Sequence, residues 1–209
     1  RQAGHLTTRQ HSNFTFWLGG VSRSMIRDIL HANPFYNSEQ QSQRYVEAEE
    51  GSYLVPSGLE REQRKLYLEA ANFTNKSYFR LLKLLAPEVK ARLRETYPAS
   101  RGKGQAVKKK LESKEKKKAQ EIARYVLPIG QKSTLYHSLS ELQLLRLFRA
   151  SKMRHLPAEA RFVVARMIEE VAEVDPSIFY ELDDPWPEEE KIDFEEGYIV
   201  EQKKEFDKS

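Results

Sequence analysis

Apolar side chains recur at three- and four-residue steps in two long parts of the chain, and this spacing predicts amphipathic helices. The first long helix is expected to be capped by Ser57. Pro87 is expected to open a further helical stretch that ends near Tyr97. The apolar stripe of this region predicts either core or a subunit interface. It consists of Leu59, Leu66, Ala70, Phe73, Leu81, Leu84 and Leu85.

Two more helices are expected toward the C-terminal end. Ser138, with Glu141 three residues later, has the pattern of a capping box ahead of a leucine-rich helix over residues 142–148. Pro157 suits the first turn of the helix that follows. One face of that helix is predicted to be buried, and it consists of Ala160, Val163, Val164, Met167, Ile168 and Val171.

Shorter apolar runs predict strands. Residues 14–18 are typical of a strand, and so are residues 44–46 and 53–55, which are separated by a turn around Gly51. The combination predicts an α+β fold that is dominated by helices. We expect a small mixed or antiparallel sheet and a subdomain built on the long helix.

Charge divides the chain further. A basic helix is predicted from about Gln105 to Tyr125, and the formal net charge of +4 hides two blocks of opposite sign. Residues 101–118 hold nine Lys or Arg against two Glu, whereas residues 173–209 hold fourteen Asp or Glu against four Lys. We therefore expect one domain over residues 1–174, with a basic helical insertion near 101–118, and an acidic tail over 175–209.

The basic segment has two interpretations. It is a solvated helix face, or it is a surface that contacts phosphate backbones without reading their sequence. The segment 101–118 contains no aromatic residue, so stacking of single-stranded bases is not expected of it.

Composition excludes several classes of protein. With 209 residues and 39% hydrophobic content, the chain is long enough to bury a core. It has no cysteine, which excludes disulfides and thiolate metal sites and suits the cytoplasm or another reducing compartment. No apolar run reaches the roughly 18 residues of a membrane span, and the five histidines form no helical pair that would suggest a metal. Because the first residue is Arg1, a processed form or part of a longer polypeptide is expected.

Ser42 and Arg44 lie two residues apart and shortly after the loop-like Asn33-Pro34. On an extended strand their side chains share a face, which places a hydroxyl beside a planar guanidinium fork. That pair suits a phosphate or a nucleotide. The alternative is a solvated strand edge on which Arg44 pairs with Glu47 or Glu49.

Three segments in a fixed order resemble the flavin-dependent thymidylate synthases. Members of that family carry a Gly-His-x-Ser/Thr entry with Phe-Thr-Phe, then Ser-x-Arg-Tyr, then Ala-Arg-x-Val-Leu-Pro. The matching segments here lie within residues 4–16, 42–45 and 123–128.

The resemblance implies a reaction and a set of ligands. The family converts deoxyuridylate (dUMP) to thymidylate with methylenetetrahydrofolate and reduced FAD. By this resemblance the dUMP side consists of Gln41, Ser42, Arg44 and Arg124, and the flavin side consists of His5, His31, Asn33, Arg146 and His155. No metal is implied.

The flavin side departs from the family pattern. Ala32, Asn33 and Pro34 stand where the family has Arg-His-Arg, and Leu142 stands where it has an Arg. One inserted residue would place His31 at the start of that triplet instead. Leu142 offers no hydrogen-bond donor on its side chain, so FAD binding is expected to be weak or absent and catalysis weakened or lost.

Three hypotheses follow. The first is a working synthase in which Asn33, Arg146 or Lys152 replaces the lost contacts. The second is an inactive structural subunit or half of a tandem protein, within a homo-oligomer (a tetramer by resemblance) or a hetero-complex with an intact copy. The third is a basic scaffold that joins a nucleic-acid-containing assembly through residues 101–118.

Overall fold

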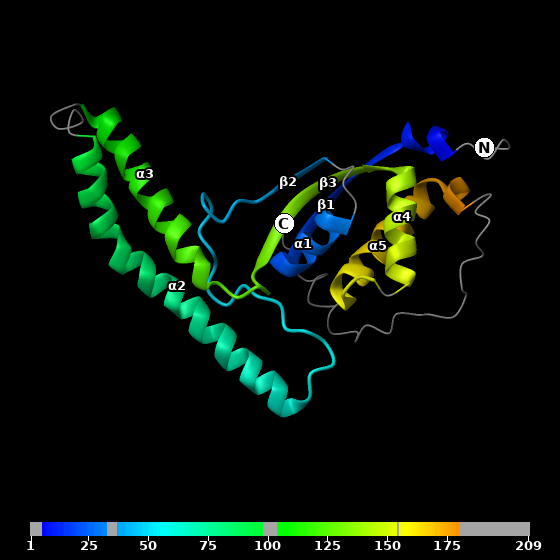
Figure 1. The fold of residues 1–209 in the computed structure, drawn as a ribbon, viewed down its shortest axis with the longest axis horizontal. Helices are drawn as coiled ribbons and strands as arrows, with labels where there is room; N and C mark the ends of the chain where they lie inside the picture. Colours follow the sequence, from blue (N-terminus) through cyan, green and yellow to red (C-terminus); the bar gives the residue numbers. More distant parts are fainter. Residues whose placement is uncertain (1–5, 33–36, 98–103, 154, 180–209) are drawn as a thin grey trace. The chain divides into compact units, whose positions relative to one another are not determined.

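The computed structural model describes residues 6–32, 37–97, 104–153 and 155–179 (Figure 1). The chain forms two compact units: unit 1 comprises residues 1–40 and 133–209, and unit 2 comprises residues 41–132. The fold is helix-dominated with a small antiparallel sheet, which confirms the predicted α+β class. The predicted limits of the domain and the acidic tail stay a prediction, and most of that tail lies outside the described residues.

The sheet of unit 1 has three strands in the described residues, in the order β1-β3-β2. They are β1 (Asn13–Ser22), β2 (Asn37–Gln40) and β3 (Lys132–Ser140). Strand β2 runs antiparallel to β3, with Ser38 opposite His137. The strand predicted over residues 14–18 is confirmed within β1, where Phe14, Phe16 and Leu18 pack against the core.

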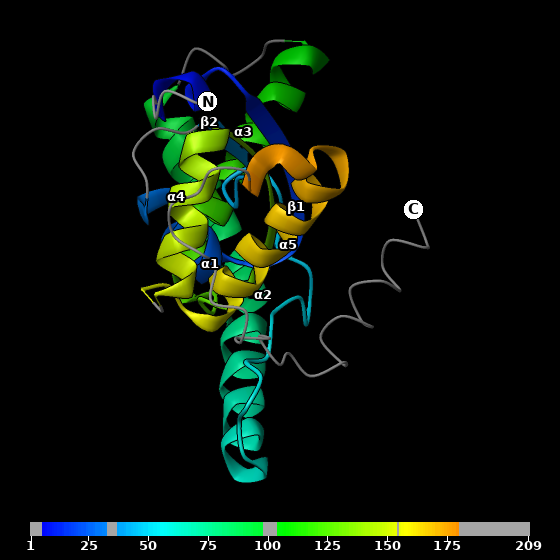
Figure 2. The same cartoon turned by 90° about the vertical axis from the view of Figure 1, so that its right-hand side faces the viewer.

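Three α-helices of unit 1 supply most of its core: α1 (Arg23–Ala32), α4 (Glu141–Lys152) and α5 (Ala158–Val174). Helix α5 packs against both α4 and α1 (Figure 2). The predicted apolar face of α5 is confirmed, since all six of its residues are buried. Helix α1 was not predicted, although Met25, Ile26 and Ile29 have helical spacing and are each 1% exposed.

The start of α4 differs from the expected capping box. Ser140 is the N-cap: its Oγ accepts the Gln143 N–H at 3.4 Å, and Gln143 Oε1 accepts the Ser140 N–H at 3.0 Å. The prediction from Ser138 and Glu141 is therefore wrong by two residues. The reason is that β3 continues to Ser140, so the chain is still extended at Ser138.

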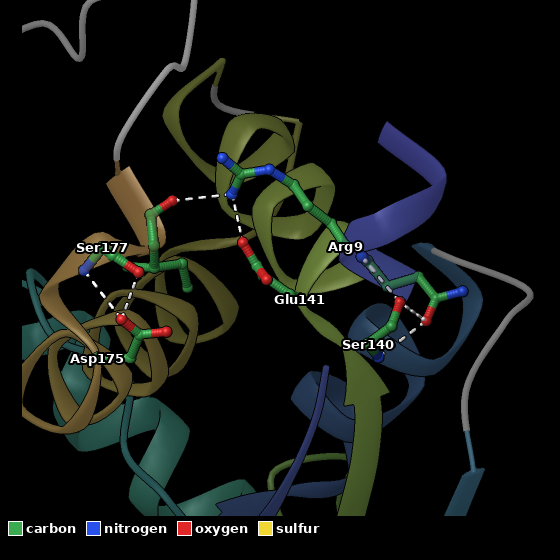
Figure 3. A network of polar contacts seen from close by, with 7 residues as sticks. Arg9, Ser140, Glu141, Asp175 and Ser177 are labelled. Atoms are coloured by element: carbon green, nitrogen blue, oxygen red, sulfur yellow. Dashed lines mark hydrogen bonds and ion pairs between the residues drawn. The ribbon is translucent and has the colours of Figure 1, made fainter. Parts of the chain in front are cut away.

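A buried ion pair joins three separate segments of unit 1 (Figure 3). The Arg9 guanidinium, on a short 3-10 helix over Leu6–Gln10, pairs with the Glu141 carboxylate. The same guanidinium donates to the Ile178 carbonyl at 3.0 Å. Both charged side chains are almost fully buried, so each depends on the other for compensation.

Unit 2 is built on two helices that lie side by side, α2 (Arg61–Thr96) and α3 (Gln105–Ala123), followed by a 3-10 turn over Arg124–Val126 (Figure 1). The basic helix predicted from Gln105 is confirmed as α3. Small buried side chains on both helices allow close packing. They include Ala71 on α2 and Ala119 and Ala123 on α3.

Helix α2 corrects three expectations. It starts at Arg61, where Gln63 Oε1 accepts the Glu60 N–H at 3.1 Å, so Ser57 is not its cap. It also continues through Pro87 without a break. The apolar stripe is not core, because Leu66, Phe73 and Leu84 are 68%, 72% and 61% exposed within the chain. The interface interpretation of that stripe stays a prediction.

Two predicted strands of unit 2 are wrong. Residues 44–46 form a turn, and in residues 53–55 only Tyr53 pairs as an isolated bridge, with Gln131. Gly130 allows the two segments to approach, since a Cβ there would lie 2.5 Å from the Tyr67 hydroxyl. That hydroxyl donates to the Leu54 carbonyl at 2.6 Å. Backbone bonds also join the two segments, from the Leu54 N–H to the Gly130 carbonyl at 2.8 Å and from the Lys132 N–H to the Ser52 carbonyl at 3.0 Å, so the pairing is limited to one bridge and not a strand.

Candidate functional site

Ser42 builds the turn that presents Arg44 in unit 2. Its carbonyl accepts the N–H groups of Tyr45 at 3.0 Å and Val46 at 2.9 Å. Its hydroxyl accepts the Arg44 N–H at 3.3 Å. The Ser42 and Arg44 side chains therefore come from a turn and not from one face of a strand. Arg44 is exposed, and so is the neighbouring Gln41.

The chain after this turn is fixed to both helices of unit 2. The Tyr78 hydroxyl on α2 accepts the Ala48 N–H at 3.4 Å, and Lys116 on α3 pairs with Glu47 at 2.8 Å. Burial raises the pKa of Tyr78, so its hydroxyl stays protonated and neutral. Asn75 Oδ1 accepts the N–H of Gly51, whose φ of 73° favours glycine.

Glu121 on α3 is the carboxylate on which the charges of both predicted arginines act. Lys118 donates to its carboxylate at 3.0 Å and is the main reason that the Glu121 pKa lies below its usual range. The positive charges of Arg44 and Arg124 lower the same pKa further. The charges of both arginines therefore act on one carboxylate, although Arg44 and Arg124 are far apart in the sequence. No ion pair of Arg44 with Glu47 or Glu49 is found among the described residues, and Glu47 pairs with Lys116.

Aromatic rings flank these cations. The Arg44 guanidinium lies 5.4 Å from the centre of the Tyr45 ring, and the Arg124 guanidinium lies 5.5 Å from that of Tyr125. The two rings are 58% and 80% exposed. Arg124 Nε is buried and has no hydrogen-bond partner among the described residues. We call Ser42, Arg44, Glu121 and Arg124 the arginine cluster.

The arginine cluster has chemistry that suits an anionic nucleotide. Two lysines add to the charge of the two guanidiniums: Lys118 pairs with Glu121 at 3.0 Å, and Lys117 lies 4.9 Å from the centre of the Tyr45 ring. A phosphate can accept charge-assisted hydrogen bonds from guanidiniums, and an exposed tyrosine ring can stack on a base.

The residues predicted for the flavin side lie in unit 1, and the described ones fall into two open pockets. His31 and His155 line one of about 530 Å³ together with Arg27 and Asp28. Arg146 lines another of about 670 Å³. The remaining lining of that second pocket consists of Gln10, Asn13, Asn37, Ser138, Leu139, Ser140 and Gln143. His5 and Asn33 lie outside the described residues.

The described residues of these pockets offer few groups that could hold an anionic cofactor. Leu142 is 5% exposed and belongs to the buried part of α4, so it presents no donor to a ligand. The Ser140 hydroxyl is engaged as the N-cap of α4. Arg146 is the single cation among the described residues that line its pocket. A flavin dinucleotide carries a diphosphate, which one guanidinium and neutral amides compensate only in part.

Glu159, shortly after His155 in the chain, has a structural role. Its carboxylate accepts the Ser22 N–H at 2.7 Å and the Ser22 hydroxyl at 2.5 Å. That hydroxyl accepts the Met25 N–H at 3.0 Å at the start of α1. Glu159 therefore stabilises the first turn of α1, where a negative charge is favourable.

Sequence reasoning missed Glu121 as a member of the site. A usable signal existed, because Glu121 and Arg124 are three residues apart on a helix and share a face. Arg27 and Asp28 were missed because α1 was not recognised. Among the described residues, no group of three or more His, Cys, Asp or Glu side chains could hold a metal ion. In the same part of the chain, no helix combines the length and hydropathy of a membrane span.

Taken together, the fold and the arginine cluster define a helix-dominated α+β protein with a cationic, aromatic-flanked site on its long-helix unit. The family model described as thymidylate synthase complementing protein matches residues 1–177. The chain therefore belongs to this family, and the resemblance drawn from its motifs is confirmed.

Individual relatives agree with this assignment. A flavin-dependent thymidylate synthase from Clostridium tetani is 28% identical, and the match covers 84% of this chain and 65% of that protein. The UMP/dUMP methylase PolB from Streptomyces cacaoi, solved with 5-Br dUMP, has a TM-score of 0.58 at 18% identity and covers 85% and 73% of the two chains. ThyX from Helicobacter pylori, solved with FAD and dUMP, has a TM-score of 0.53 at 13% identity, with coverage of 84% and 75%. The chain thus spans just under two thirds of the length of the Clostridium relative.

Proposed function

We propose that this chain is a diverged member of its family that still binds a dUMP-like nucleotide and has weakened or lost flavin-dependent methylation. The observation that carries the proposal is that unit 2 presents Arg44 and Arg124 each beside an exposed tyrosine ring, at 5.4 and 5.5 Å from the ring centres. Two structural neighbours were solved with dUMP or its 5-bromo derivative, which supports the same ligand class.

The arginine cluster offers a specific role for each group. The Arg44 side chain is exposed, so its guanidinium can donate to a phosphate, and the Ser42 hydroxyl is two residues away in the chain. The guanidinium of Arg124 lies beside the exposed Tyr125 ring and can donate charge-assisted hydrogen bonds to a ligand oxygen. The exposed Tyr45 and Tyr125 rings offer faces for the base.

Binding of dUMP is expected to depend on both arginines. A hydrogen bond to a charged group contributes about 1.5–3 kcal/mol, so Arg44→Ala or Arg124→Ala should weaken binding about ten- to a hundred-fold in calorimetry. Arg94→Ala is the matched control, because Arg94 is also exposed, also in unit 2, and lies near the far end of α2. Absence of heat at millimolar dUMP, or equal losses in all three variants, would refute nucleotide binding by this cluster.

Isolated protein is expected to carry little or no flavin, because Leu142 is buried and Arg146 is the single described cation of its pocket. The absorption spectrum of protein purified with and without added FAD measures this directly. Near-stoichiometric flavin without supplementation would contradict the expectation and favour a working synthase.

A further inference from the structure

Helix α3 carries a row of cations on the side away from its buried face. Lys110, Lys114, Lys117 and Arg124 follow one another at steps of four, three and seven residues, which places them on one side of a helix. The three lysines are exposed, while Ala119 and Ala123, on the other side, are 3% and 0% exposed. Fourteen residues of helix span roughly 21 Å.

Most of these cations lie over a tyrosine. Lys114 Nζ is 5.0 Å from the Tyr97 ring centre, Lys117 Nζ is 4.9 Å from that of Tyr45, and the Arg124 guanidinium is 5.5 Å from that of Tyr125. The rings remain 48%, 58% and 80% exposed. They come from the end of α2, from the turn after Ser42 and from the residue after Arg124. The aromatic rings that segment 101–118 lacks are therefore supplied from outside it.

We propose that this cation–tyrosine row, formed by Lys110, Lys114, Lys117, Arg124 and the three tyrosines, is a binding surface for single-stranded nucleic acid. Alternating cations and exposed rings match the two features of such a ligand, its phosphates and its unpaired bases. A duplex hides its base faces by stacking and would engage only the cations. The flanking Lys108 and Lys109 are also exposed and extend the positive charge beyond Lys110.

This surface goes beyond the proposed mononucleotide site. Arg124, Lys117, Tyr45 and Tyr125 are shared with the mononucleotide site, whereas Lys110, Lys114 and Tyr97 lie toward the other end of the row and belong to the row alone. Variants at those three positions leave every member of the arginine cluster in place. Lys117 and Tyr45 are kept unchanged in the test because Tyr45 also contacts Arg44.

The charge half of the proposal is tested with the full chain and a fluorescein-labelled oligothymidylate of roughly twelve nucleotides, within the usual range of single-strand site sizes. Anisotropy is measured over a range of salt concentrations. Each phosphate contact contributes a slope of about −0.7 in log K against log salt, so Lys110→Ala/Lys114→Ala should make the slope shallower by about 1.4. The control is Lys83→Ala/Lys90→Ala, which removes two exposed lysines from α2.

The stacking half is tested with Tyr97→Leu. Loss of one stacked base should weaken oligothymidylate binding about five- to a hundred-fold with the salt slope unchanged. Binding of dUMP by the same variants should equal that of the parent protein. A failure of the surface is therefore distinguishable from a failure of the mononucleotide site.

Four results would overturn the proposal. They are absence of oligothymidylate binding at low salt, equal losses in the two lysine double variants, unchanged affinity in Tyr97→Leu, and equally tight binding of a duplex of the same length. Displacement of the oligonucleotide by a synthetic peptide of residues 180–209 at similar concentration would also overturn it, by identifying the acidic segment as the occupant.

Discussion

Arg9→Met is expected to lower the free energy of unfolding by about 3–5 kcal/mol, since it leaves the buried Glu141 carboxylate without its cation. The loss should be large because the Arg9 guanidinium also bonds the Ile178 carbonyl and so joins three segments of unit 1. Urea unfolding followed by circular dichroism measures the change.

A second substitution separates the charge effect from lost packing. In Arg9→Met/Glu141→Met both charges are replaced by apolar side chains of similar length, which should recover much of the stability. Arg166→Ala is the control, because Arg166 forms an exposed pair with Glu169 and should change stability by at most about 1 kcal/mol. If Arg9→Met and Arg166→Ala had similar small effects, the buried pair would not hold these segments together.

The sequence predicts buried positions correctly where the helical spacing of apolar residues matches the packing in the structure. The apolar face of α5 is an example, since its residues recur at three- and four-residue steps and all of them are buried. Strand β1 was found from its alternating aromatic residues. Strand β3 was not, because its buried positions include Ser133 and His137 beside Leu135 and Leu139, so burial alternates while hydropathy does not.

Helix α2 shows where the same reasoning fails. Its exposed stripe has the spacing of a core face, but the side that packs on α3 is marked by Ala71, Asn75 and Tyr78 instead. Asn75 and Tyr78 are buried because they hold the backbone near residues 48–51 through hydrogen bonds. Because these buried side chains are polar and serve as hydrogen-bond partners, the sequence of this face shows no hydrophobic pattern.

The motifs gave the residues of the candidate site, whose role stays a prediction, and did not give their geometry. Ser42, Arg44 and Arg124 were identified from motifs, and a shared strand face was the expected arrangement. The structure instead has a turn at Ser42, and the charges of Arg44 and Arg124 act on Glu121. Both features depend on how the loop packs on α3. The same packing brings Tyr45 and Tyr97 to the basic helix, which no local window of sequence reveals.

His137 should make the stability of the protein depend on pH. It is 2% exposed on β3, and its Nδ1 forms a 2.5 Å hydrogen bond with the Ser38 hydroxyl of β2. Burial lowers the pKa of His137 to about 4, from an ordinary value of 6.5. Above pH 6.5 the imidazole is neutral in both the folded and the unfolded chain, so it has no pH-dependent effect there.

As the pH falls below 6.5, the unfolded chain binds a proton that the folded chain rejects, and stability is lost until the pH reaches about 4. Each pH unit in this window corresponds to about 1.4 kcal/mol, which gives a loss of roughly 2 kcal/mol between pH 7.5 and pH 5. Urea unfolding at a series of pH values should show this slope in the parent protein and in His11→Gln, whose histidine is exposed. His137→Gln should flatten it, because the neutral amide does not titrate. A slope that persists unchanged in His137→Gln would show that other groups produce the pH dependence.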